Sequence, residues 1–294
     1  RIQQVKNFPT ADLLIGGYPC QSFSMGGKRK PQDDSRSDLY LEYARAIQLI
    51  NPKFFVAENV IGLRSVHAGS YLQKQLETFE NCGKHGYWVS WQVLNAAHYG
   101  VPQRRKRLFI VGVRKDLGVR YVFPAPTHGK GLLPFVSHGD VISGMPIWPD
   151  GEFYERPGGD TDTFPWYYMS RNRKARWDDP SFTIVANWRH VTLHPASPTM
   201  TLTWSKLEDG WKQRWDFSKN YEHTTVEKKR IVLEKPRRLS WRECARLQTF
   251  PDFFEPHGNI QAKFTQIGNA VPPALAKAVI QPLLDGSGLV PIVT

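Results

Sequence analysis

Short apolar runs separated by polar stretches mark the first part of the chain. Four of them, rich in Phe, Ile, Val and Leu, cover residues 11–16, 53–57, 88–94 and 107–113. Runs of this length are typical of buried strands in a parallel sheet. Apolar positions at helical spacing predict a helix over residues 39–50, and a second helix is predicted over residues 71–81. Because strands and helices alternate, we expect a doubly wound α/β domain with a parallel or mixed sheet.

The pattern changes near residue 123. From there to about residue 239 the chain is rich in Pro, Gly, Trp and Arg and shows no helical period. We therefore expect a second, smaller domain of strands and loops. Residues 266–284 predict a turn followed by a helix, because Pro272 and Pro273 suit a first helical turn. The predicted division is a first domain over residues 1–123, a second over 124–258, and a return to the first over 259–294.

The overall composition adds a bias toward polyanions. The 294 residues carry 39 Lys and Arg against 27 Asp and Glu, a formal charge of +12. Such an excess attracts nucleic acid, although charge alone leaves the partner open. No apolar run approaches the roughly 20 residues of a membrane helix, so we expect a cytoplasmic protein without a membrane partner. The three cysteines show no disulfide framework and no metal-ligand spacing, which predicts free thiols.

Candidate chemistry follows two of the predicted strands. In open α/β sheets ligands bind beyond the carboxyl ends of the strands. Cys20 follows the first run and Glu58 the second, so a thiol and a carboxylate are expected to point toward one crevice. Each has an ordinary alternative: an isolated Cys is more often an inert buried thiol, and Glu58 could simply neighbour a helix N-cap. The Gly- and Lys-rich loop after Cys20 favours a thiolate, because positive surroundings lower the pKa of a thiol.

A basic cluster opens the fourth predicted strand. Alternate side chains of a strand share a face, so Gln103, Arg105 and Arg107 are expected to project together. Arg104 and Lys106 would then project to the opposite side. A solvated basic edge is the alternative, but a run that leads directly into an apolar strand favours a binding role.

Five motifs, in this order, resemble those of the DNA cytosine-5 methyltransferases. They are GGYPCQSFS from residue 16, AENV from residue 57, QRRKR from residue 103, RRLSWRECARLQTFPD from residue 237 and QIGNAVPPALA from residue 266. Residues 169–198 are similar to the target-recognition region of bacterial GGCC-specific methylases. The resemblance implies a Rossmann-like S-adenosylmethionine-dependent methyltransferase sheet with a smaller, irregular β and loop target-recognition domain. It also implies the modification half of a bacterial restriction-modification system, associated with nucleoid DNA.

The resemblance assigns a role to each candidate residue. Cys20 would add as a thiolate to C6 of a flipped cytosine, so that C5 can attack the methyl group of S-adenosylmethionine. Glu58 would donate a hydrogen bond to N3, which requires burial to raise its pKa. Arg107 is expected near the cytosine O2, and Asn59 would help to hold the Glu58 loop. Arg105 and Gln103 complete the predicted catalytic set, and no metal is required.

Further residues are assigned to the cofactor and to double-stranded DNA. For S-adenosylmethionine the resemblance implies Pro19, Leu39, Asn269, Ala270 and Val271. For DNA it implies an active-site loop over residues 21–38 that includes Gln21, Ser24, Lys28, Arg29 and Lys30. The second domain would read the sequence through Arg171, Arg173, Arg189 and His190. Because Arg can donate to both guanine O6 and N7, we expect a short G·C-rich site.

The sequence departs from the family pattern before Cys20. The family's Gly-rich cofactor loop and its acidic ribose-binding residue precede the Pro-Cys motif, whereas only 19 residues precede Cys20. We therefore expect the N-terminal strands to be missing, and the cofactor loop to be supplied by a further N-terminal segment or a second polypeptide. Asn187 and Trp188 also stand where the GGCC branch has small residues.

Two alternative functions remain open. One is a tRNA cytosine-5 methyltransferase, which the long insertion over residues 124–235 disfavours. The other is a catalytically incomplete DNA-binding subunit of a split enzyme. The presence of Cys20, Glu58 and Arg107 argues against a chain that has long lost catalysis.

Overall fold

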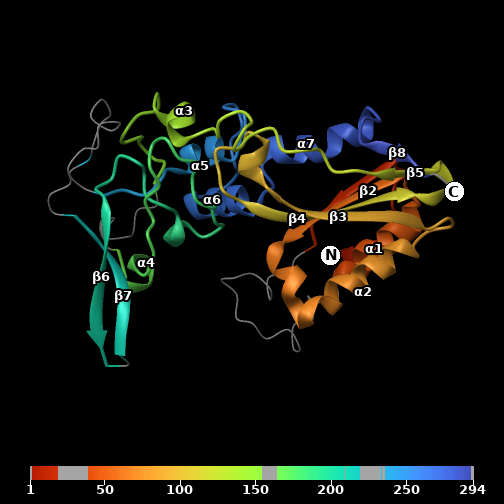
Figure 1. Cartoon of the computed structure of the whole chain (residues 1–294), viewed down its shortest axis with the longest axis horizontal. Coiled ribbons are helices and arrows are strands. Elements are labelled where there is room, and N and C mark those ends of the chain that lie inside the picture. Colours follow the sequence, from red (N-terminus) through yellow and green to blue (C-terminus); the bar gives the residue numbers. More distant parts are fainter. Residues whose placement is uncertain are drawn as a thin grey trace. The chain divides into compact units, whose positions relative to one another are not determined.

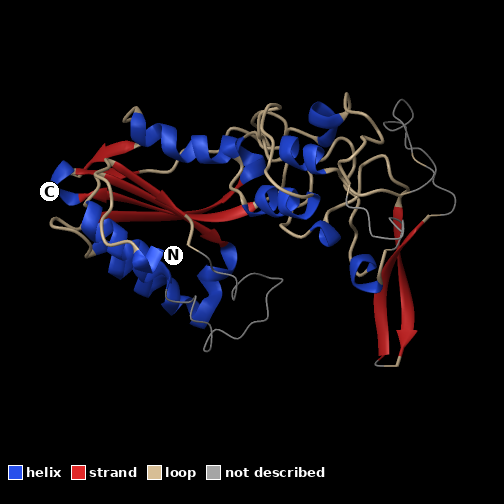
Figure 2. Ribbon diagram, turned by 180° about the vertical axis from the view of Figure 1, so that it is seen from behind, coloured by secondary structure: helices blue, strands red, loops and turns tan. Residues whose placement is uncertain are grey.

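The structure, a computed structural model, describes residues 2–18, 39–153, 164–208, 210–218, 233 and 236–292. Their contacts divide the chain into two compact units. Unit 1 comprises Arg1–Asn95, Lys106–Pro126 and Ala276–Thr294, and unit 2 comprises Ala96–Arg105 and Thr127–Leu275. Most of the regular strand and helix structure lies in unit 1, whereas unit 2 is built largely from loops (Figure 2).

A four-stranded mixed sheet forms the centre of unit 1. Its strands are β1 (Leu13–Gly16), β2 (Phe54–Val60), β3 (Tyr87–Asn95) and β4 (Lys106–Arg114), in the order β1-β2-β4-β3. β1 and β2 are parallel, whereas β4 is antiparallel to both of its neighbours. The expected parallel or mixed sheet is therefore a mixed one. The physical reason is the short connection Ala96–Arg105 between β3 and β4, because a parallel crossover needs about a dozen residues or more.

Two helices cover one face of this sheet and a third covers the other (Figure 1). α1 (Leu39–Ile50) has the predicted bounds, and α2 (Ser70–Glu80) differs from its prediction by one residue at each end. On the opposite face lie residues 276–284 of α7 (Pro273–Leu284), whose first residue is the predicted N-terminal proline. Within the described ranges, no helix has both the length and the apolar character that a membrane span needs.

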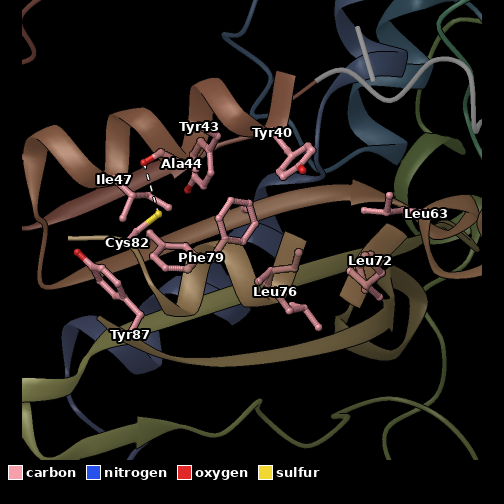
Figure 3. Packing of buried hydrophobic residues seen from close by; sticks show 14 residues of the cluster. Tyr40, Tyr43, Ala44, Ile47, Leu63, Leu72, Leu76, Phe79, Cys82 and Tyr87 are labelled. Carbon is pink, nitrogen blue, oxygen red and sulfur yellow. Dashed lines mark hydrogen bonds between the residues drawn. The ribbon is translucent and has the colours of Figure 1, made fainter. Parts of the chain in front are cut away.

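The main core of unit 1 lies between the sheet and the pair α1 and α2. Figure 3 shows the side chains of both helices meeting there, with aromatic rings at their centre. Phe79 is fully buried and contacts Tyr43 edge to face at a centroid distance of 5.8 Å. The Cys82 thiol donates a hydrogen bond to the Ala44 carbonyl and belongs to this core. Burying each large apolar side chain contributes about 1.5–3 kcal/mol, so this core fixes the position of the strands.

Shorter elements complete unit 1. The 3₁₀ helix η4 (Ile61–Gly69) leads from β2 to α2, and η1 (Ile2–Gln4) and η6 (Lys115–Leu117) are single turns. β5 (Val119–Tyr121) pairs with β8 (Leu289–Pro291) in an antiparallel ribbon. This ribbon ties the C-terminal segment to the sheet domain.

Unit 2 contains short helices and one long hairpin. The helices are α3 (His138–Ile142), α4 (Trp166–Met169), α5 (Trp241–Leu247) and α6 (Ile260–Asn269), with the 3₁₀ turns η5 (Ala96–Tyr99) and η7 (Trp188–His190). The hairpin consists of β6 (Met200–Leu207) and β7 (Gly210–Phe217). The predicted irregular β and loop character of this part describes it well.

The limits of the units differ from the predicted domain limits at three places, the smallest being residues 124–126, which belong to unit 1. The other two are longer. Residues 96–105 and 259–275 belong to unit 2, although the sequence pattern assigned both segments to the first domain. The reason for the second is that Phe264 and Ile267 of α6 are buried in one core with Trp241 and Leu247 of α5. By its contacts, the chain therefore returns to unit 1 at residue 276.

Candidate active site

Glu58 and Arg107 form an ion pair on neighbouring strands of unit 1. The Arg107 Nε atom lies 2.8 Å from the Glu58 Oε1 atom, and both side chains are largely buried. The register explains this contact: Glu58 lies opposite Phe109 and Val60 opposite Arg107, so the pair is diagonal on one face. Burial lowers the pKa of the Arg107 guanidinium, and the nearby Glu58 carboxylate opposes that shift. Arginine still remains charged, so the site holds a fixed cation beside a carboxylate.

Asn59 connects this pair to the end of β1. Its Nδ2 donates to the Tyr18 carbonyl at 3.4 Å, while its Oδ1 accepts from the amide of Val60 at 2.8 Å. A Cβ atom added to Gly17 would lie 3.3 Å from the Glu58 Oε2 atom, so the backbone after β1 approaches the carboxylate closely. The carboxyl ends of β1 and β2 thus meet at Glu58. Pro19 and Cys20, which follow Tyr18 in the sequence, lie outside the described residues.

Tyr18 is held at three points, and the sequence did not single it out. Its ring packs against Tyr43 and Phe79 at centroid distances of 5.8 and 6.3 Å. Its hydroxyl donates to the Oε1 atom of the buried Gln75 at 2.6 Å, and its carbonyl accepts from Asn59. One available signal was Gln75 itself, a polar residue at an apolar position of α2.

Gln103 and Arg105 are completely buried in unit 2. The Arg105 guanidinium donates to the carbonyls of Ile184, Gly268 and Ala270 at 2.7, 2.8 and 2.9 Å. The Gln103 Oε1 atom accepts from the amide of Ile184 at 2.9 Å. The expected common face of Gln103, Arg105 and Arg107 is not observed, because β4 and its alternation begin only at Lys106.

The described residues predicted for the cofactor are divided between the two units, Leu39 in unit 1 and the other three in unit 2. Leu39 begins α1 and is half-buried, the exposed Asn269 ends α6, and the half-buried Ala270 and Val271 follow it. Alkyl groups and one amide fit the apolar and hydrogen-bonding parts of S-adenosylmethionine. None of these residues supplies a carboxylate for the ribose hydroxyls, so they fit the cofactor only in part. Among the described residues, no group of three or more His, Cys, Asp or Glu is placed to hold a metal ion.

The predicted DNA-reading residues of unit 2 fall into two kinds. Arg171 and Arg189 are exposed, with the Arg189 guanidinium 5.2 Å from the Trp188 ring centroid. Arg173 is half-buried and donates to the carbonyls of Tyr168 and His190 at 3.1 and 3.4 Å. Arg173 therefore supports the backbone of η7 through the His190 carbonyl, while the exposed Arg171 and Arg189 remain accessible to a partner.

His190 of η7 lies near four arginines, whose positive charges affect its pKa. Burial lowers the pKa of its ring, and the positive charges of the nearby arginines lower it further. Those arginines are Arg173, Arg171, Arg238 and Arg189. A neutral imidazole beside Tyr167, at a centroid distance of 5.1 Å, can both donate and accept hydrogen bonds. The predicted loop residues Gln21, Ser24, Lys28, Arg29 and Lys30 lie outside the described residues.

Sequence relatives carry consistent names. The chain is similar to the Type II methyltransferase M.BsuRI of Bacillus subtilis, with 40% identity over 296 residues, covering 97% of this chain and 61% of the relative. It is also similar to the Type II methyltransferase M.MthTI of Methanothermobacter thermautotrophicus, with 38% identity over 272 residues, covering 90% and 76%. The Type II methyltransferase M.BspRI of Lysinibacillus sphaericus is 39% identical over 290 residues, covering 95% and 61%. The chain thus spans about three fifths of the length of M.BsuRI and M.BspRI.

Solved structures confirm the predicted fold class. A DNA modification methyltransferase encoded within a prophage of E. coli matches with a TM-score of 0.61 and 22% identity, covering 93% of this chain and 78% of that one. The Dnmt2 methyltransferase of S. pombe matches with a TM-score of 0.52 and 17% identity, with the same coverage. At these identities the likeness concerns the fold, which is the predicted Rossmann-like methyltransferase architecture.

The family assignment rests on most of the chain. The model of the C-5 cytosine-specific DNA methylases matches residues 1–134 and 150–285. The methyl donor of this family is S-adenosylmethionine, as the five motifs predicted. Together with the relatives named Type II methyltransferases, this match shows that the chain belongs to the C-5 cytosine-specific DNA methylase family.

Proposed function

We propose that this chain forms part of an enzyme that methylates C5 of a cytosine in a short G·C-rich site of double-stranded DNA. The observation that carries the proposal is the Glu58–Arg107 pair, held at the carboxyl ends of β1 and β2 by Asn59 and Tyr18. The acid and the cation of this pair belong to the site where the backbone of Gly17, three residues before Cys20 in the sequence, approaches Glu58. The relatives named Type II methyltransferases support its use within a restriction-modification system, and association with nucleoid DNA stays a prediction.

The residues of this chain would activate the cytosine ring. The Cys20 thiolate adds to C6 of a base that has left the helix, and the electron pair that moves into the ring is accommodated at N3. Glu58 provides the proton at N3, and Arg107 keeps Glu58 in place and faces O2. S-adenosylmethionine, when bound, supplies the methyl group that C5 takes up. A base then removes the C5 proton, Cys20 leaves as a thiolate, and N3 returns its proton.

The ion pair has a consequence for Glu58. In the proposal Glu58 gives a proton to N3 when a base enters, and Arg107, whose Nε atom lies 2.8 Å from the Glu58 Oε1 atom, orients the carboxyl group. A flipped cytosine would bury the pair more deeply, which favours the neutral acid. Arg107 therefore has two roles in the proposal: it orients the carboxylate before binding and contacts the base afterwards.

The test uses the full protein with labelled methyl donor. Cys20→Ser should abolish label incorporation into duplex DNA while DNA binding survives, because a hydroxyl does not form an anion readily near neutral pH. Glu58→Gln should slow incorporation severely. Glu42→Gln is the matched control, since Glu42 also pairs with an arginine, Arg45, at 2.8 Å. Near-normal turnover by Cys20→Ser, or label entering tRNA instead of duplex DNA, contradicts the proposal.

The sequence preference is tested separately on unit 2. Replacing Arg171 or Arg189 by Ala should relax the choice at one base position, at about 1–3 kcal/mol, because a bidentate contact to guanine is lost. Arg173→Ala should weaken binding to all sites alike, since Arg173 supports the backbone of η7. Methylation of a library of duplex sites distinguishes these patterns. An unchanged base preference in both Arg171→Ala and Arg189→Ala would locate recognition elsewhere.

A further inference from the structure

The β6–β7 hairpin of unit 2 carries one apolar face that becomes exposed toward its far end. Directly opposite residues share a face, and here Leu202 lies opposite Trp215, Trp204 opposite Gln213, and Lys206 opposite Trp211. Leu202, Trp204 and Trp211 are 46%, 61% and 66% exposed. Exposed apolar surface of this extent, gathered on one face, marks an interaction site more often than a random surface.

The near end of the same face belongs to a core. Met200 is buried with Tyr168, Met169 and Leu193, and Trp215 and Phe217 pack against that cluster. Figure 1 shows β6 and β7 running on together beyond α4. The apolar face is therefore continuous, and only its far part, which we call the indole face (Leu202, Trp204, Lys206 and Trp211), is left without this cover.

The opposite face is polar and bonded within itself. The Thr203 hydroxyl donates to Asp216 at 2.6 Å, and Arg214 forms an ion pair with the same carboxylate. Arg214 also lies 5.3 Å from the ring centroid of Trp166. The polar side chains of this face therefore have partners within the hairpin, whereas the indoles of the other face are exposed to solvent. A hairpin under selection for stability alone would bury its indoles.

The surroundings of the indole face are positively charged. Gln213, which lies opposite Trp204, donates to the Ser170 carbonyl at 3.3 Å, and Ser170 directly precedes the exposed Arg171. The lowered pKa of His190 shows that Arg171 belongs to a group of four arginines. Lys206 adds a cation beside Trp211. Glu208, which follows β6, carries the opposite charge, so we expect contact along the indole face and not at the turn.

We infer that the indole face binds duplex DNA in the major groove, beside the base pairs that Arg171 reads. This inference rests on the proposed function and extends it to the DNA that flanks the methylated site. A two-stranded ribbon fits the major groove, indoles pack against thymine methyl groups and base edges, and Lys206 reaches a phosphate. The positive surroundings favour this polyanion over an apolar protein segment.

The test compares two double variants of the full protein. Trp204→Thr with Trp211→Thr replaces the indoles with β-branched side chains that suit strands. Trp88→Thr with Trp91→Thr is the matched control, because both are strand tryptophans of unit 1 and each is 42% exposed. On a duplex with at least one helical turn on each side of the site, the hairpin variant should bind about tenfold more weakly than the parent. On a duplex trimmed to the site, the hairpin variant and the parent should bind alike, and the control should match the parent on both.

Three results overturn the inference. One is equal affinity of parent and hairpin variant for the long duplex. Another is equal weakening on the long and trimmed duplexes, which would place the defect outside the flanks. The third is a dimeric parent and a monomeric hairpin variant in sedimentation, which would assign the indole face to a second copy. Methylation by the parent is measured on the same DNA: its absence contradicts the proposed function, whereas its presence with unchanged variant binding contradicts only this inference.

Discussion

Arg105 and Arg107 have different environments although they are two positions apart, because β4 begins between them. Arg105 donates to three backbone carbonyls inside unit 2, whereas Arg107 pairs with the Glu58 carboxylate in unit 1. Both belong to one basic run in the sequence, so residue type alone predicted the same role for them. Both are largely buried, so their partners separate them, and the partners depend on where the strand starts.

Lysine substitutions should separate the two roles. Arg105→Lys should lower the free energy of unfolding markedly, because one ammonium cannot serve three buried carbonyls and each unsatisfied group costs about 1–3 kcal/mol. Arg107→Lys should leave stability nearly unchanged but reduce methyl transfer, since the ammonium lacks the planar fork that orients Glu58. Urea unfolding and label incorporation measure the two effects. An Arg105→Lys protein with the parent's unfolding midpoint would show that these hydrogen bonds are dispensable.

Tyr18 tests whether the end of β1 must be held for catalysis. Tyr18→Phe keeps the ring against Tyr43 and Phe79 but removes the hydroxyl that donates to Gln75. Tyr87→Phe is the matched control, because its hydroxyl donates to the Pro52 carbonyl at 2.7 Å in the same core. Each variant should lose about 1 kcal/mol of stability. Only Tyr18→Phe should lower kcat, with KM for DNA unchanged; an equal kcat in both variants would make the Tyr18 hydroxyl purely structural.

At the scale of elements, helices were predicted well and strand partners less well. α1 was recognised because Tyr43, Ala46 and Ile47 recur at helical spacing on its buried face. The reversed direction of β4 depends on the length of a connection and not on its own apolar run. The β6–β7 hairpin was not predicted as such, because only the near end of its apolar face is covered, by the core that contains Met200, while Trp204 and Trp211 are exposed.

At Gly268 in α6, helix propensity favours alanine, whereas close packing requires glycine. Alanine is the better helix former by about 1 kcal/mol, but a Cβ on Gly268 would lie 2.3 Å from backbone atoms of Val185 and Ala186. Because backbone cannot move aside cheaply, we expect Gly268→Ala to lower the melting temperature. Gly144→Ala is the control, since no atom lies within 4 Å of its added Cβ. A Gly268→Ala protein as stable as the parent would mean that α6 shifts without loss.

At the scale of the whole chain, a change in composition near residue 123 predicted two compact parts, but contacts decide their membership. Residues 259–275 follow α5 into unit 2 because α6 completes its core. Of the residues predicted for catalysis, Glu58, Asn59 and Arg107 lie together in unit 1, Gln103 and Arg105 are buried in unit 2, and Cys20 lies outside the described residues. The supporting residues Tyr18 and Gln75 were not predicted, since their importance comes from contacts between elements distant in the sequence.

Unit 2 also buries two histidines, and this determines how its stability responds to acid. Burial lowers the pKa of His138 to about 4, against the opposing effect of the Asp179 and Arg176 carbonyls. Burial and then the positive charge of Arg237 lower the pKa of His194 to about 2. The 3.5 Å contact of His194 with Glu243 is therefore not an ion pair near neutral pH. Both rings are neutral in the folded protein, whereas unfolded histidines titrate near pH 6.5.

Acid should therefore destabilise unit 2 through these two histidines. Below about pH 6.5 the unfolded chain binds protons that folded His138 and His194 do not, so stability is complete above that pH and falls toward pH 4. Each histidine contributes about 1.4 kcal/mol per pH unit in this window. His138→Gln should reduce the decline in unfolding free energy between pH 6 and pH 4.5 by about that amount per unit, whereas the exposed His257→Gln should not. Urea unfolding at several pH values measures the slope, and a His138→Gln slope equal to the parent's would show that folded His138 takes up protons as readily as the unfolded chain does.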